Sequence, residues 1–380
     1  MRTPKYVVAA HVVSYAAGVA EHVDERTVMR IVPARVGLVG NPSDGFRGAV
    51  FGTVIPALTA SLTARTSTGI ALIGPTGARH HPSPHDWIED VRTSGHVGEP
   101  RVISAALWTL VEHLERGGGH SRGLGVHLTW TTSIPRSVGL AGSSALAVGA
   151  IEATAELWGV HLDKRVIAAL ALSAERDVLG IAAGWQDRIV QSFRTAVLVD
   201  ASATEVVDGV HVPRVRSLAV AARPGLSHLP LVVGWIEADG SPSDDYHGPL
   251  RRAGESLEAP MKELARLARS AFVAASVGDV IALAGAVDAG WRIRQECAPL
   301  RPDHTALVER VRAAGFSATT PGSGGAVVAV CVDAAEATRA VVVLEAAGCT
   351  AIRFDLFAAS DQSAMSKRYT FVSRATKPSR

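Results

Sequence analysis

The feature that most limits how this chain can fold is a loop of small residues leading directly into an apolar helix. It reads SIPRSVGLAGSSALAVGAIEA, from Ser133 to Ala153. Gly139 and Gly142 permit backbone conformations that other residues avoid, and they leave room for a close neighbour. The predicted helix start offers free backbone N–H groups and the positive end of the helix dipole. These properties predict either a phosphate-binding loop or a packed helix start capped by Ser143 or Ser144.

Two familiar loop motifs are excluded by the residues of this segment. It lacks the Gly-Lys-Ser/Thr ending of a Walker A loop. It is also not the G-x-S-x-G elbow of serine hydrolases, because Ser144 is followed by Ala145 and Leu146. Taken alone, the segment leaves phosphate binding and helix capping equally open.

Two acids lie downstream on a stretch interrupted by glycines, SAERDVLGIAAGWQDRIVQSF. Glu175 and Asp187 lie on either side of this interruption, so two helices can direct them into one pocket. Phosphoryl transfer needs one carboxylate near a phosphate-bound metal ion and another that accepts or orients the hydroxyl proton. Arg188 can hold Asp187 ionised or bind an anion. A solvated helix face is the alternative for either acid.

Two further loops carry polar or glycine-rich sequences. In ARVGLVGNPSDG, the side chains of Asn41, Ser43 and Asp44 suit sugar hydroxyls, although such residues also form Asx turns unaided. In TTPGSGGAVVAV, the run from Gly322 to Gly325 predicts a loop that approaches another part of the chain closely. Glycine turns before strands are common, so this second loop indicates little by itself.

Periodicity and composition outline two α+β halves. Apolar spacing predicts helices over 103–116, 255–278, 280–297 and 304–314, and strands within 123–135, 228–238 and 325–333. Residues 70–99 are rich in Gly, Pro and His and are predicted to form a loop. A connecting hairpin is predicted over 203–224, and the boundary between domains is drawn between residues 210 and 211.

The bulk composition excludes several functional classes. The 380 residues suit two domains, and a net charge of +2 gives no electrostatic signature for nucleic acid or a membrane surface. Cys297, Cys331 and Cys349 form neither a disulfide framework nor a metal-ligand pattern, which favours a reducing, cytoplasmic location. The segment KYVVAAHVVSYAAGVAEH partly imitates a signal peptide, but a strand or short helix is the preferred interpretation.

The four motif-bearing stretches, in this order, resemble the GHMP kinases. That family has a first substrate-binding motif, then Pro-x-x-x-Gly-Leu-x-Ser-Ser-Ala, then a glycine-rich third motif. The chain has PRSVGLAGSSA, with one additional residue between Leu140 and the serine pair. Together with ARVGLVGNPSDG, LGIAAGWQDRIVQ and GSGGAVVA, this makes the chain most similar to glucuronokinase-like sugar-1-kinases.

The resemblance implies a two-domain α+β fold, in which a ribosomal S5 domain 2-like N-terminal half binds ATP. A ferredoxin-like C-terminal half would complete the site. It also implies an ATP- and Mg²⁺-dependent phosphotransferase that forms the 1-phosphate of a sugar such as glucuronic acid. The implied partners are ATP and a small-molecule acceptor, with no nucleic acid or membrane, in a monomer or homodimer.

Roles for individual residues also follow from the resemblance. Asp187 would act at the acceptor hydroxyl and Arg35 on the developing phosphate charge, while Ser144 and Glu175 would hold Mg²⁺. The ATP-binding set would be Pro135, Gly139, Leu140, Ala141, Gly142, Ser143, Ser144 and Ala145. The substrate-binding set would be Asn41, Ser43, Asp44, Arg188, Gly322, Ser323, Gly324 and Gly325.

Some features depart from the family pattern and keep alternatives open. The segment SDDYHGPLRR replaces an expected shorter Ser-Gly-Lys-type segment, so the substrate pocket can differ. A kinase acting on another sugar, an amino acid or a natural-product intermediate is one alternative. A non-catalytic regulator that binds a sugar or nucleotide is another, although Ser144, Glu175 and Asp187 argue against it.

Overall fold

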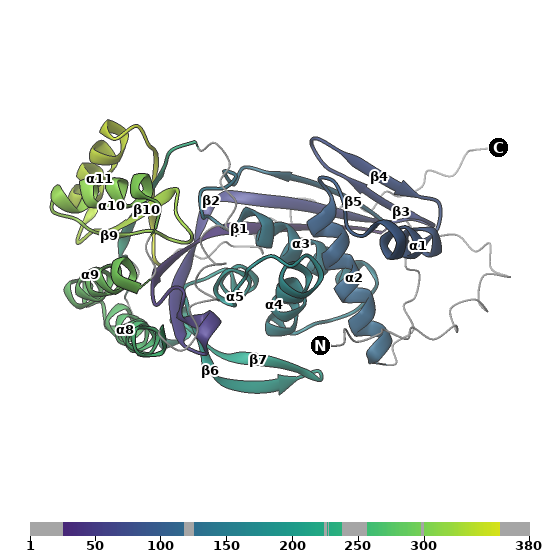
Figure 1. Ribbon diagram of the computed structural model, residues 1–380, viewed down its shortest axis with the longest axis horizontal. Coiled ribbons are helices and arrows are strands. Elements are labelled where there is room, and N and C mark those ends of the chain that lie inside the picture. The colour runs from purple at the N-terminus through teal and green to yellow at the C-terminus, as the bar shows by residue number, and fades with distance from the viewer. Residues whose placement is uncertain are drawn as a thin grey trace, which may run out of the picture.

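The structure is a computed structural model that describes residues 26–117, 125–223, 226, 228–237, 257–297 and 300–357. The predictions for the N-terminal 25 residues and for SDDYHGPLRR lie outside these residues. The described chain forms two β-sheets, each with its own set of helices (Figure 1). The predicted two-part α+β architecture is thereby confirmed.

The first sheet is built around one long central strand. Its order is β4 (Ala78–His81), β3 (Ile70–Ile73), β5 (Val126–Thr132), β2 (Ala49–Thr66), β6 (Val197–Val207) and β7 (Val210–Ser217). A further strand, β1 (Thr27–Val39), pairs antiparallel with β2. The ladder between β1 and β2 shifts register at Pro33/Ala34, directly before Arg35. Such bulges re-aim side chains, and here the bulge precedes a predicted catalytic residue.

Helices cover one face of this sheet (Figure 1): α2 (Arg101–Arg116), α3 (Gly142–Leu157), α4 (Lys164–Ser173) and α5 (Gln186–Phe193). Helix α3 packs against the three other helices and against β1 and β2, so almost its whole surface is buried. A side chain at Gly149 would collide with Leu62 of β2, so glycine allows the helix to lie close on the sheet. The apolar run therefore anchors the loop that precedes it.

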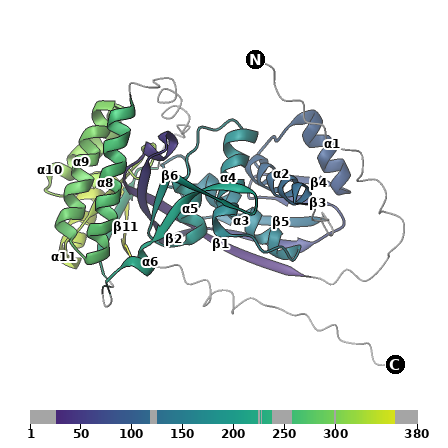
Figure 2. The same ribbon diagram turned by 90° about the horizontal axis from the view of Figure 1, so that it is seen from below.

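The second sheet lies at the other end of the molecule (Figure 2). Its antiparallel order is β11 (Thr350–Asp355), β8 (Pro230–Trp235), β10 (Ala326–Val330) and β9 (Ser317–Thr319). Its helices are α8 (Glu258–Val277), α9 (Val280–Cys297), α10 (Pro302–Ala313) and α11 (Ala334–Ala346). The chain order of one strand, helices, two strands, a helix and a last strand is that of a ferredoxin-like unit. The implied fold of this half is confirmed.

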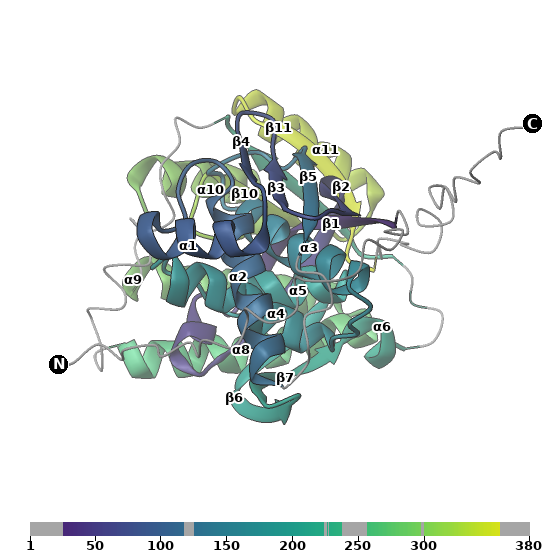
Figure 3. The same cartoon turned by 90° about the vertical axis from the view of Figure 1, so that its right-hand side faces the viewer.

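Two predictions about connections need correction. Residues 70–99, predicted as a loop, contain β3, β4 and helix α1 (Pro84–Ser94), whose N-cap Ser83 accepts the N–H of Asp86. The hairpin predicted over 203–224 is present as β6 and β7, but it begins earlier, at Val197, and belongs to the first sheet, from which it projects (Figure 3); the short helix α6 (Leu218–Ala221) follows it. The chain changes sheet only after β7, later than the boundary drawn at 210/211.

The described helices include none that is both long enough and apolar enough to cross a bilayer.

Candidate active site

A cavity of about 1040 Å³ collects residues from all four motif-bearing stretches. It extends from the 3-10 helix η2 (Ser43–Phe46) to the N-terminal end of α2. Of the predicted site residues, the wall contains Arg35, Asn41, Asp44, Pro135, Gly139, Leu140, Ala141, Gly142, Ser143, Ser144, Glu175, Asp187, Arg188, Gly322 and Ser323. The structure therefore brings most of the predicted set together. Ser43, Ala145, Gly324 and Gly325 lie outside the wall.

The loop before α3 does not end in a serine cap. The N-cap residue is Ala141, and no side chain forms a capping hydrogen bond there. The capping alternative for Ser143 and Ser144 is therefore wrong. Ala141 has φ +65°, in the left-handed region that residues with a side chain rarely adopt. Among the described residues, no side chain caps the backbone N–H groups at the start of α3, which leaves them available to an anion.

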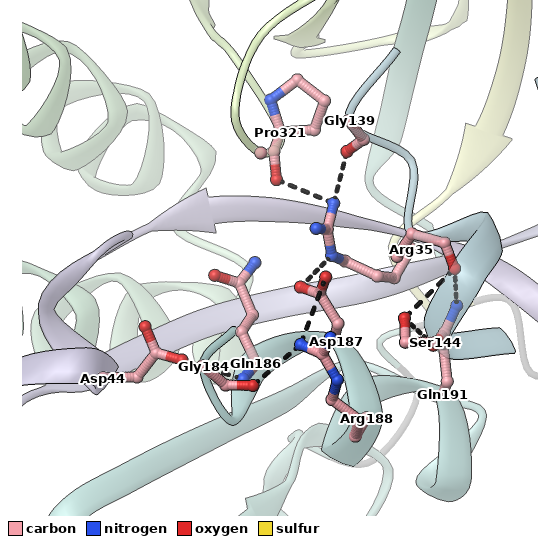
Figure 4. A network of polar contacts seen from close by, with 12 residues as sticks. Arg35, Asp44, Gly139, Ser144, Gly184, Gln186, Asp187, Arg188, Gln191 and Pro321 are labelled. Carbon is pink, nitrogen blue, oxygen red and sulfur yellow. Dashed lines mark hydrogen bonds and ion pairs between the residues drawn. The ribbon is translucent and has the colours of Figure 1, made fainter. Parts of the chain in front are cut away.

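The two adjacent serines point to different partners. Ser143 donates its hydroxyl to Glu175 Oε1 at 2.6 Å. Ser144 is buried and donates to Gln191 Oε1 at 2.8 Å, while Gln191 Nε2 donates to the Ala141 carbonyl at 2.8 Å (Figure 4). The structure thus joins Ser143, and not the expected Ser144, to Glu175.

Glu175 lies on a single π-helical turn, η3 (Ala174–Val178), and is buried. Arg188 Nε donates to Glu175 Oε2 at 2.7 Å, and Arg188 Nη2 makes a second contact with the same oxygen. Although burial opposes its charge, the nearby carboxylates of Glu175 and Asp187 raise the pKa of Arg188 above its usual value. The Arg188 guanidinium, which was predicted to bind an anion or to hold Asp187 ionised, is therefore paired with Glu175.

Arg35 links the two halves of the molecule at the centre of the cavity. Its Nε donates to Asp187 Oδ1 at 2.6 Å (Figure 4). Its Nη1 donates to the Gly139 carbonyl at 2.6 Å and to the Pro321 carbonyl at 3.1 Å. One buried guanidinium therefore fixes Asp187, the loop before α3 and the third glycine loop relative to one another.

The third glycine loop packs directly on the loop before α3. A Cβ atom at Gly139 would lie 2.6 Å from the Gly324 carbonyl oxygen, so this approach requires glycine. Arg294 of α9, which is also buried, donates to the carbonyls of Thr320 and Gly322, each at 2.9 Å. Sequence reasoning missed Arg294, since nothing in its surroundings along the chain marks it.

The loop around η2 forms the opposite part of the wall. Asp44 is 8% exposed, and its Oδ2 accepts the N–H of Gln186 at 2.9 Å. Burial raises the pKa of Asp44, and the negative charge of Asp187 raises it further. The hydrogen bond from the Gln186 N–H acts in the opposite direction. Ser43 is fully buried and donates to the Ala49 carbonyl at 2.8 Å, so it shapes the loop and does not face the cavity.

Several wall residues were missed by sequence reasoning. Gln186 is 2% exposed, and within the described chain neither polar atom of its amide has a hydrogen-bond partner. The buried carboxylate oxygens of Glu99 likewise have no hydrogen bond there, with the Arg136 guanidinium 3.8 Å away. The position of Gln186 directly before Asp187 is a signal that was available in the sequence.

The described residues hold no group of three or more His, Cys, Asp or Glu side chains that could bind a metal ion by themselves. A divalent ion here would need further oxygen ligands, such as substrate phosphates, which is how Mg²⁺ is usually held in proteins that act on nucleotides.

Comparison with known proteins shows which family this chain resembles. Residues 101–194 match the family model of the GHMP kinases N terminal domain. The chain is 29% identical to Glucuronokinase 1 of Arabidopsis thaliana over 322 residues, which cover 78% of this chain and 83% of that protein. Its fold is similar to Lactococcus lactis galactokinase complexed with galactose, with a TM-score of 0.65 at 17% identity, covering 88% and 94% of the two chains.

A second solved structure, Streptococcus pneumoniae phosphomevalonate kinase in complex with phosphomevalonate and AMPPNP, has a TM-score of 0.67 at 12% identity, covering 86% of this chain and all of that one. At these identities the two solved structures establish the fold alone. The N-terminal domain match and the similarity along most of the chain confirm the resemblance to the GHMP kinases, and with it the expectation of a phosphotransferase with an alcohol group as acceptor.

Proposed function

We propose that this protein is an ATP- and Mg²⁺-dependent kinase that phosphorylates the anomeric hydroxyl of a sugar such as glucuronic acid, giving the sugar 1-phosphate. The observation that carries the proposal is the Arg35–Asp187 pair, because it lies between the loop before α3 and the loop around η2. The similarity to a protein named glucuronokinase supports the choice of acceptor.

Asp187 is the residue that would receive the acceptor proton. One of its oxygens is held by Arg35, which leaves the carboxylate fixed in direction beside the cavity. The acceptor oxygen forms a bond to the γ-phosphorus, the bond from that phosphorus to the bridging oxygen of ADP breaks, and the proton moves to Asp187. Because phosphoryl transfer has a loose transition state, orienting the hydroxyl contributes more than strong basicity. Arg35 adds positive charge where the transferred group passes.

The loop before α3 would bind the triphosphate. Gly139 and Gly142 bring the backbone close, and the N–H groups at the start of α3 favour negative charge. The hydroxyl of Ser143 and the carboxylate of Glu175 are hard oxygen donors of the kind Mg²⁺ prefers, and they already adjoin each other. When bound, Mg²⁺ neutralises phosphate charge. Ser144 faces Gln191 and is proposed to support the loop.

The two serines can be separated experimentally. We expect Ser143→Ala to raise the Mg²⁺ concentration needed for half-maximal activity by about tenfold, because a hydroxyl ligand is worth on the order of 1.4 kcal/mol. Ser144→Ala should leave that concentration unchanged and lower the free energy of unfolding by about 1 kcal/mol, because Gln191 loses a buried partner. Mg²⁺ titration of activity and denaturant unfolding measure both. If Ser144→Ala raised the Mg²⁺ requirement and Ser143→Ala did not, Ser144 would be the metal ligand.

A coupled assay of ADP release tests the proposed function directly. The acceptors are glucuronic acid, galacturonic acid, glucose, ribose and small non-sugar alcohols, and phosphorus NMR identifies the position phosphorylated. We expect turnover with a uronic acid and a 1-phosphate product. Turnover confined to a non-sugar alcohol would select the alternative kinase. Binding of ATP in calorimetry without turnover on any acceptor would select the non-catalytic regulator.

The three cysteines are free, as a reducing compartment requires, and we place the protein in the cytoplasm on that ground.

A further inference from the structure

Arg47 is an accessible positive charge on the wall of the cavity. It follows η2 directly, on the same wall as Asn41 and Asp44. Its side chain is exposed, and the guanidinium forms no hydrogen bond or ion pair with another residue that the structure describes. No sequence motif marks Arg47, because it lies just beyond the NPSDG turn.

Most of the other positive charges of the wall are already paired with acidic side chains of the protein. Among the residues that the structure describes, six arginines line the cavity, and four of them face a carboxylate of the protein: Arg35 with Asp187, Arg136 with Glu99, Arg176 with Asp177 and Arg188 with Glu175. The two that remain are Arg47, near Asp44, and Arg101, at the start of α2. Of these two, only Arg47 lies beside Asn41 and Asp44, the part of the wall proposed to bind the acceptor and called the acceptor end below.

The backbone of Arg47 is strained. Its φ of +58° and ψ of 28° lie in the left-handed region, where glycine is the preferred residue. The loop enforces this conformation, because the Ser43 carbonyl accepts the N–H groups of both Arg47 and Gly48. A long charged side chain held where glycine would be easier indicates that the side chain itself is used.

Charge at the acceptor end also favours this use. Asp187 is paired with Arg35, but Asp44 has no ion pair among the described residues, so in its charged form it would repel an anionic acceptor. A guanidinium can compensate, since it binds a carboxylate or a phosphate through two parallel hydrogen bonds. A neutral sugar has no anionic group that could pair with the guanidinium.

We infer that Arg47 binds an anionic substituent of the acceptor, so that the substrate class is acidic sugars and not neutral ones. The inference rests on the proposed kinase function. A sugar acid and a sugar phosphate both supply the required anion, and the substrates below distinguish them.

The test compares Arg47→Gln, Arg47→Gly and the matched control Arg101→Gln with glucuronic acid, glucose 6-phosphate and glucose. We expect both Arg47 variants to lower kcat/KM for the preferred anionic sugar by about 10- to 100-fold, mainly through KM. The value for glucose should stay within about threefold, and Arg101→Gln should leave the ratio of acidic to neutral sugar unchanged. Arg47→Gly should unfold at no lower temperature than wild type, because glycine accepts the local φ.

Equal losses for acidic and neutral sugars, or no loss, would overturn the inference. A wild-type preference for glucose 6-phosphate that depends on Arg47 would support it, with phosphate as the anion. Calorimetric titration of glucuronate and glucose 6-phosphate without nucleotide gives a readout that does not need turnover. Binding that Arg47→Gln abolishes would support the inference even if the kinase proposal failed, and equal or absent binding in both proteins would overturn it.

Discussion

Asp187→Asn should lower kcat by about 10²- to 10⁴-fold while nucleotide binding stays close to that of wild type. Asparagine has the size of aspartate, and its side-chain oxygen can still accept the Nε–H of Arg35, which now lies 2.6 Å from Asp187 Oδ1. The geometry around Arg35, Gly139 and Pro321 should therefore persist. What is lost is a group that can take the acceptor proton. Steady-state ADP release measures kcat, and calorimetry measures nucleotide affinity.

The matched control is Asp177→Asn on the neighbouring turn η3. Asp177 is half exposed, forms an ion pair with Arg176 and is absent from the wall of the cavity. Its replacement should leave kcat within about twofold, because exposed ion pairs contribute little. If Asp187→Asn retained more than a tenth of wild-type kcat, the proton would have to go elsewhere and the proposed role of Asp187 would be wrong.

The sequence predicted the fold best where the pattern was long. Helices α8 and α9 have 20 and 18 residues, enough for the apolar spacing to stand out. Helix α1 was missed because Gly, Pro and His dominate its surroundings. Its buried Trp87 packs edge-on against Trp108 of α2, with ring centroids 5.9 Å apart, and donates to Ser104. A short helix stabilised by such tertiary packing leaves little trace in local propensity.

The residues that line the cavity were predicted more fully than the hydrogen bonds that connect them. Consecutive residues on a helix point about 100° apart, so the choice between Ser143 and Ser144 depends on where α3 begins. That start is set by Ala141, whose backbone is left-handed. The contact from Arg35 to the Pro321 carbonyl spans 286 positions in the sequence. No local pattern encodes such a contact, and only the docking of the two halves creates it.

Arg188→Met should destabilise the protein by about 3 to 5 kcal/mol, because it leaves the Glu175 carboxylate buried without its counter-charge. The two side chains are only 5% and 2% exposed, and Arg188 also donates to the Gly184 carbonyl at 2.9 Å. Denaturant unfolding measures the change. The control is Arg266→Met on α8, whose ion pair with Glu263 is exposed and should contribute little to stability.

A double variant separates stability from catalysis at the same site. Adding Glu175→Gln to Arg188→Met removes both charges, so most of the lost free energy of unfolding should return, since a neutral buried pair carries no uncompensated charge. The Mg²⁺ requirement should nevertheless stay raised, because the carboxylate proposed to accompany Ser143 at the metal is gone. Recovery of both properties would make Glu175 a purely structural partner of Arg188. Recovery of stability alone would mean that the buried pair holds in place a carboxylate that the reaction needs.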